Sequence, residues 1–175
     1  FATSKAGIAI NYTPWLRDLA VNDVFLASLA GYYKITDGQA ISLGLRYFKL
    51  GSIDFTDAFG NPAGNGKPRE FAIDLGYSRK LSKKIGLGIA IRYINSSLAQ
   101  GAVTSGGVNY KAGSSVAGDV HLYHHGAKEN GQGLNWGLTL SNLGSKISYS
   151  SDTTQKDFIP ANLGLGLAYT KVFDE

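Results

Sequence analysis

The chain has 175 residues, no Cys, no Met and a formal net charge of +4. The absence of cysteine argues against a disulfide scaffold, a thiolate metal site and a cysteine nucleophile. No run of Lys and Arg interleaved with aromatic residues is present, so the mild positive charge does not indicate a nucleic-acid partner. The sequence also lacks the stretch of about 18 apolar residues that a transmembrane helix needs.

In chain order, eight segments alternate between apolar residues and small or polar ones, with the period of two that indicates a β-strand. In the third segment, for example, Ile41, Leu43 and Leu45 are separated by small or polar residues. The predicted strands are Lys5–Tyr12, Val24–Tyr33, Gln39–Leu50, Arg69–Arg79, Ile85–Ser96, Ser114–His124, Leu134–Leu143 and Ile159–Lys171.

The connections between these segments alternate between short and long. Short polar turns are expected at 36–38, 81–84 and 129–133, and long connections at 13–23, 51–68, 97–113 and 144–158. Outer-membrane β-barrels have short turns at the periplasmic rim and long loops outside. The pattern therefore predicts an all-β fold, an antiparallel up-and-down transmembrane β-barrel, with residues 1–175 forming part of one barrel domain. A soluble β-sandwich, in which the apolar stripes pack on each other, is the alternative.

Aromatic residues stand near both ends of the apolar stripes, as expected of the two interfacial girdles of a membrane barrel. Packing in an ordinary core is the other interpretation. The residues on the short-turn side are Tyr32, Tyr77, Tyr123 and Tyr169, and those on the long-connection side are Tyr12, Tyr47, Phe71 and Tyr93.

Four charged residues fall in the middle of neighbouring strands on the polar face, namely Arg46, Asp74, Arg92 and Asp119. If the strands pair in chain order, these side chains reach a similar depth with alternating sign, and opposite charges on adjacent strands pair. We expect this luminal charge ladder to fill and stiffen the barrel interior. A polar pathway or a ligand-orienting site is the alternative interpretation.

Catalytic and metal-binding patterns are weak. His121 lies two residues from Asp119 on one strand, which displays both in parallel and does not make a triad. His124 and His125 lack a carboxylate or a further ligand at useful spacing and are expected at a solvated rim. We therefore expect no enzyme, no metal site and no cofactor.

The first long connection begins with Thr13 and Pro14, a helix-capping residue followed by proline. This pair predicts one or two helical turns that expose Trp15, Leu16 or Leu19 at the outer rim. Such apolar side chains either tuck into the barrel mouth or meet a partner protein.

Several runs resemble the PorV family, the FadL-like outer-membrane proteins of the type IX secretion system. They are Tyr12–Leu16, Asp23–Ser28, Leu43–Phe48, Gly51–Asp57, Ser141–Gly144 and Ile159–Leu163, and the resemblance covers essentially the whole chain. It implies a 14-stranded barrel in the full protein. The chain, which does not begin with Met, is then expected to be an N-terminal or central fragment with about eight strands.

The resemblance also implies a function. Members of this family bind the C-terminal domain of secreted cargo at the translocon barrel and carry it to a sortase and attachment complex at the cell surface. On this basis the partners are the translocon, the cargo domains, the sortase complex and outer-membrane lipid. From loop position alone, the candidate extracellular contacts are Trp15, Leu16, Leu19, Phe55, Phe59, Val108 and Tyr110. A FadL-type transporter of hydrophobic small molecules is the alternative function, and it requires an apolar pocket near the ladder.

Overall fold

The computed structural model describes residues 4–16, 23–57, 59–98, 111–128, 131–150 and 156–172. These residues form β-strands and connections without any helix, and therefore no helix long and apolar enough to cross a membrane is found among them. The strands are β1 (Ala6–Pro14), β2 (Val24–Thr36), β3 (Gln39–Leu50), β4 (Ile53–Thr56), β5 (Pro62–Gly66), β6 (Arg69–Lys80), β7 (Ile85–Ser97), β8 (Gly113–His125), β9 (Gly133–Gly144) and β10 (Asn162–Thr170).

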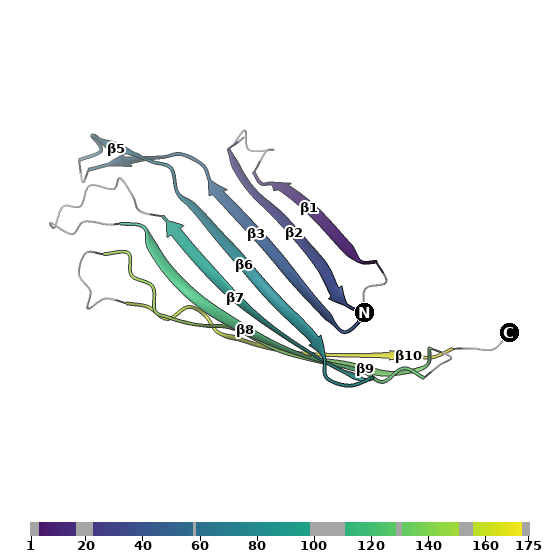
Figure 1. Ribbon diagram of the computed structural model, residues 1–175. Coiled ribbons are helices and arrows are strands. Elements are labelled where there is room, and N and C mark those ends of the chain that lie inside the picture. The colour runs from purple at the N-terminus through teal and green to yellow at the C-terminus, as the bar shows by residue number, and fades with distance from the viewer. Residues whose placement is uncertain are drawn as a thin grey trace.

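Eight strands form one sheet in the order β1-β2-β3-β6-β7-β8-β9-β10, and every neighbouring pair is antiparallel. The up-and-down order of the predicted strands is therefore confirmed. The sheet curves into an open trough, with the short turns at one end and the long connections at the other (Figure 1). This architecture is consistent with a β-barrel, although the sheet is not closed.

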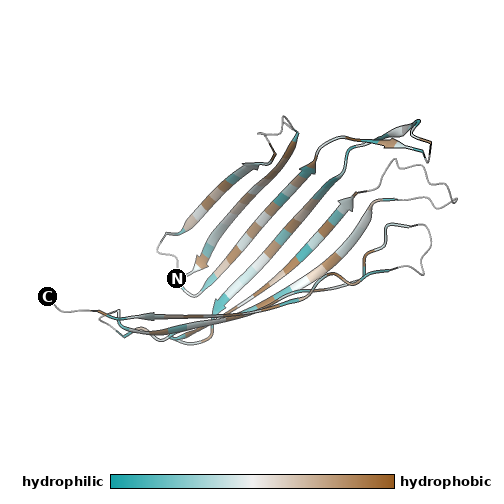
Figure 2. Cartoon of the chain, turned by 180° about the vertical axis from the view of Figure 1, so that it is seen from behind, coloured by the Kyte–Doolittle hydropathy of each residue, from teal (hydrophilic) through white to brown (hydrophobic). Residues whose placement is uncertain are grey.

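The sheet is a single layer with two different faces. Apolar and polar residues alternate along each strand, which appears as bands of colour in Figure 2. The apolar face is widely exposed; Ile10 is 79% exposed and Leu165 is 71% exposed. Among the described residues only Val24 and Ala117 are buried hydrophobics, so no second layer packs on the stripes and the sandwich alternative is wrong.

A row of aromatic rings lies on the apolar face near the long connections. The ring of Phe25 lies 5.3 Å from that of Tyr12 and 6.0 Å from that of Tyr47, and the rings of Phe71 and Tyr93 are also 6.0 Å apart. Phe25 joins this row although the sequence pattern did not single it out.

The aromatic residues at the short-turn end divide between the two faces. Tyr77 and Tyr169 are exposed on the apolar face. Tyr32 pairs in register with Ser42, and Tyr123 with Gly86, which places both on the polar face. The assignment of Tyr32 and Tyr123 to an outer girdle is therefore wrong, because the strand alternation at these two positions turns them inward.

Two long connections differ from the prediction. Thr13 and Pro14 do not start a helix, because they continue β1 and pair with Leu26 and Phe25. The backbone N–H of Trp15 donates to the carbonyl of Val24 on β2. At the preceding residue, Pro14, an N–H would point to the opposite side, away from β2. Because β1 lies at the edge of the sheet, proline at this position removes no hydrogen bond between strands. The connection 51–68 contains a β-hairpin, formed by β4 and β5, that the sequence pattern did not predict.

Candidate functional site

The four charged residues of the ladder form one continuous chain of ion pairs across the concave face. Arg46 Nη2 on β3 lies 3.0 Å from Asp74 Oδ2 on β6. The same carboxylate accepts a hydrogen bond from Arg92 Nε on β7. Arg92 Nη2 then lies 2.9 Å from Asp119 Oδ2 on β8. Each guanidinium meets at least one carboxylate, and the two Arg and two Asp residues leave the ladder with no net charge.

Asn142 on β9 closes the chain, and sequence reasoning did not assign it to the site. A β-bulge between β8 and β9 falls at Asp119, and Asn142 adopts a φ of +59° in the opposite strand. Its backbone N–H donates to Asp119 Oδ1 at 2.8 Å, while its side-chain Oδ1 accepts from Arg92 Nη1. Asparagine tolerates the left-handed backbone conformation better than most residues. An asparagine within a predicted strand was therefore the one sign in the sequence of an irregularity at this position.

The ladder becomes more buried from one end to the other. The side chain of Arg46 is 49% exposed, that of Asp74 19%, that of Arg92 15% and that of Asp119 4%. A glycine makes room for it, because a Cβ on Gly44 would lie 3.2 Å from Asp74 Oδ2. Arg92 is therefore the central residue, since it touches both carboxylates and Asn142.

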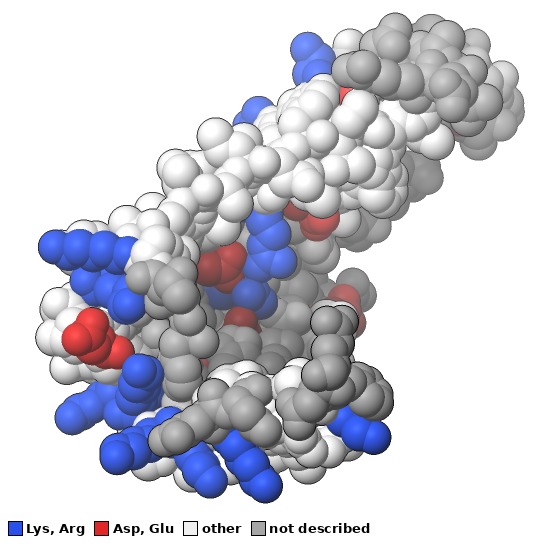
Figure 3. Space-filling model, turned by 90° about the vertical axis from the view of Figure 1, so that its right-hand side faces the viewer, with Lys and Arg blue, Asp and Glu red and all other residues white. Residues whose placement is uncertain are grey.

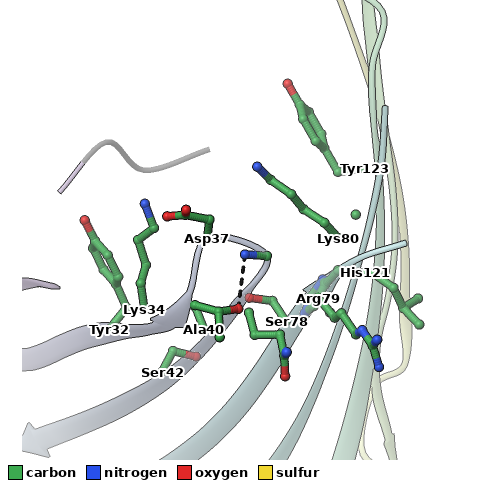
Figure 4. Close-up of a pocket in the computed structure, with 16 residues that line it drawn as sticks. Tyr32, Lys34, Asp37, Ala40, Ser42, Ser78, Arg79, Lys80, His121 and Tyr123 are labelled. Atoms are coloured by element: carbon green, nitrogen blue, oxygen red, sulfur yellow. Dashed lines mark hydrogen bonds between the residues drawn. The ribbon is translucent and has the colours of Figure 1, made fainter. Parts of the chain in front are cut away.

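A cavity of about 410 Å³ lies between the ladder and the short turns. Its walls come from β2, β3, β6, β7 and β8, and it combines aromatic and charged side chains (Figure 4). Tyr32, Lys34 and Asp37 stand on one side, and Lys80 and Tyr123 on the other. His121 lines the same cavity and lies 3.1 Å from the hydroxyl of Thr139.

A second cavity, of about 260 Å³, lies on the other side of the ladder, toward the long connections. Its lining includes the apolar side chains of Leu26, Phe48, Ile94 and Ile159. Residues of the ladder line it as well. The ring of Trp15 meets that of Phe48 edge-on at a centroid distance of 5.6 Å and remains 49% exposed. The ring of Trp15 therefore contacts a residue that lines this cavity and is still accessible from outside it.

The β4–β5 hairpin presents an exposed aromatic side chain. Asp57 Oδ1 accepts hydrogen bonds from the backbone N–H groups of Phe59 and Asn61, at 2.8 and 2.9 Å, and Oδ2 accepts one from Asn61 Nδ2 at 3.0 Å. These bonds to Asn61 and its neighbours favour the carboxylate and lower the pKa of Asp57. The turn fixed in this way leaves Phe59 90% exposed.

Two of the remaining candidate contacts, Leu16 and Phe55, lie in the described part of the chain. Leu16 is 51% exposed with a φ of +58°, and Phe55 is half-buried on β4. Leu19, Val108 and Tyr110 lie outside the described residues.

The histidines are divided between the faces of the sheet. His124 stacks on Trp136 at 5.4 Å, and His125 stacks on Tyr123 at 6.4 Å, while His121 bonds Thr139. The described residues contain no group of three or more His, Asp or Glu that could hold a metal ion.

Replacing Arg92 should destabilise the fold far more than replacing Arg46. Arg92→Met leaves the carboxylate of Asp119 buried without its cation, and removal of one partner from a buried pair costs about 3 kcal/mol or more. Arg46→Met removes a half-exposed cation, for which a loss within about 1 kcal/mol is expected. Urea unfolding of the full-length protein folded in detergent measures both changes. Equal losses would show that Arg92 is not the central residue.

The β4–β5 hairpin should lose order in acid. Because the pKa of Asp57 is lowered in the folded hairpin, its stabilising effect is complete above the ordinary aspartate value of about 4 and disappears as the pH falls through the lowered value. Hydrogen exchange of residues 53–66, corrected for the intrinsic pH dependence of exchange, measures this step. Asp57→Asn should abolish it and Asp54→Asn should retain it. A step that survives Asp57→Asn would assign the titration to another group.

Comparison of the sequence with models of known protein families identifies a match. A family model described as type IX secretion system protein PorV matches residues 1–175, the whole chain. No curated protein matches the sequence. The chain therefore belongs to the PorV family of type IX secretion system proteins.

Proposed function

We propose that this protein is a non-enzymatic outer-membrane component of the type IX secretion system. It binds the C-terminal domain of secreted cargo at the translocon and carries it to the surface sortase and attachment complex. The long connections then face the outside of the cell and the short turns face the periplasm, as is general for bacterial barrels.

The observation that carries the proposal is the built hairpin at the long-connection end. An aromatic side chain that is 90% exposed, on a turn held by three hydrogen bonds to one carboxylate, offers a partner protein one apolar contact in a fixed position. Aromatic residues also contribute disproportionately to binding energy at protein interfaces. Family membership supports partners within the secretion system. The wide apolar face supports placement in a membrane, because water would oppose its exposure.

Affinity capture of the full-length protein tests the proposal. We expect Phe59→Ala, and the double change Trp15→Ala/Leu16→Ala, to weaken capture of a purified cargo C-terminal domain roughly tenfold, the effect of an interface hot spot. Leu81→Ala is the matched control, since it removes a side chain that is 58% exposed at the opposite end. Capture that is unchanged in both loop variants, or weakened equally in the control, would contradict the assignment of these loops.

A second candidate function is FadL-type transport of hydrophobic small molecules. The cavity of about 260 Å³ supports it, because apolar side chains, among them Leu26, Phe48 and Ile94, line it directly beside the ladder. Such a site holds an apolar chain against the wall and a polar head near Arg46.

Filling this cavity separates the two functions. Ile94→Trp should displace a fluorescent fatty acid from the purified full-length protein if transport is the function, while leaving cargo capture intact. If the fatty acid does not bind the wild-type protein at all, the transport hypothesis is wrong.

A further inference from the structure

Basic side chains collect at the short-turn end of the sheet. We define the basic collar as Lys5, Arg79, Lys83, Lys84, Lys128 and Lys171, all of them exposed. The one acidic side chain among the described residues of this end is Asp37, and it lines the inner cavity. Glu129, Asp174 and Glu175 lie outside the described residues. Figure 3 looks at this end, where Lys and Arg side chains gather along the lower rim.

The opposite end has a mixed charge. Basic and acidic side chains are interspersed there, and Lys49 lies 3.9 Å from Asp23. The ladder in the middle of the concave face is neutral. The excess positive charge of the described residues is therefore concentrated at one rim.

The collar has a repeated arrangement on the apolar face. Along β6, Arg79 follows Tyr77 by two residues, so both point to the same side of the sheet. Lys171, the first residue after β10, follows Tyr169 by the same spacing. At the other edge of the sheet, Lys5 Nζ lies 5.5 Å from the ring centroid of Tyr33. In all three places a tyrosine lies near the end of an apolar stripe, and a cation lies beside it or just beyond it; on β2, Ile35 still follows Tyr33.

This order of groups matches the layers of a bilayer leaflet. Apolar side chains face the hydrocarbon, tyrosines lie at the interface, and Lys and Arg reach the headgroups beyond it. Because the arrangement recurs from one edge of the sheet to the other, it fits a surface that surrounds the protein and not a partner that touches one patch. The positive charge selects lipids with a net negative headgroup.

We propose that the basic collar binds the phosphate headgroups of anionic phospholipids in the membrane leaflet that adjoins the short turns. Phosphatidylglycerol has the required chemistry. This inference rests on the membrane placement given under the proposed function, and it adds a lipid preference and a side of the membrane to it.

Lipid selectivity in vesicles tests the collar. The full-length protein is reconstituted in phosphatidylcholine, and the fraction of motionally restricted spin-labelled lipid is compared for phosphatidylglycerol and phosphatidylcholine probes. We expect a preference for the anionic probe of roughly fivefold, the ratio that one well-placed basic side chain supplies. In about 0.5 M salt the preference should approach one, because the exposed charges are screened.

Two charge-matched variants locate the effect. The triple change Arg79→Gln/Lys83→Gln/Lys84→Gln should abolish most of the preference. The control Lys67→Gln/Lys111→Gln/Lys156→Gln removes three exposed cations at the long-connection end and should retain it. Restriction of the phosphatidylcholine probe reports whether each variant is folded in the bilayer. An absent preference, or equal losses in both variants, would overturn the proposal.

Two other outcomes have distinct meanings. If the collar variant releases a co-purified acidic protein without altering lipid selectivity, the rim is a protein-docking surface and the lipid proposal is wrong. If the wild-type protein does not float with phosphatidylcholine vesicles, the membrane placement itself fails, and the proposed function fails with it. If the wild-type protein floats with the vesicles but shows no preference for the anionic probe, only the lipid proposal is wrong and the membrane placement stands.

Discussion

The carboxylate of Asp119 has a side chain that is only 4% exposed, and such a group is tolerated only with positive charge and hydrogen-bond donors around it. Arg92 supplies the charge, and the backbone N–H of Asn142 supplies a donor. Because Arg92 also bonds Asp74, and Asp74 meets Arg46, this requirement extends from β8 back to β3. A slip of one residue in any of these strands would turn its charged side chain onto the apolar face. The ladder therefore fixes the register of the central strands.

The alternation of side chains along the strands allowed the charge ladder to be predicted from the sequence. Successive side chains of a strand point to opposite faces, so the alternation around Arg46, Asp74, Arg92 and Asp119 is sufficient to predict that all four lie on one face. Chain-order pairing then placed opposite charges on adjacent strands. The rhythm of the connections supplied the missing element, the up-and-down order, which the sheet topology confirms.

The features that the sequence did not reveal depend on local exceptions to this alternation or on tertiary contacts. Asn142 joins the ladder through a bulge, and a bulge leaves little trace in a pattern of period two. Thr13 and Pro14 read as a helix start, but pairing with β2 outweighs that local preference. The β4–β5 hairpin depends on Asp57, whose role appears only when its carboxylate faces three donors at once. Tyr32 and Tyr123 are a different case, because the alternation itself places Tyr32 on the side of Ser28 and Tyr123 on the side of Asp119; position along the strand alone gave the wrong face.

The neutrality of the ladder also affects which surfaces of the protein can bind a charged partner. Alternating charges that satisfy one another produce little field beyond their own pairs, so the middle of the concave face gives an ion or a charged peptide little to recognise. The unbalanced surfaces lie at the two ends. One end presents the exposed side chain of Phe59 and the ring of Trp15 against Phe48, and the other presents a rim of cations near tyrosines. Because the central charges are paired with one another, the two ends of the sheet can differ in charge and hydrophobicity. If the proposed function and the proposed lipid contact are correct, the ladder keeps these two surfaces apart, because it fixes the strands that lie between them.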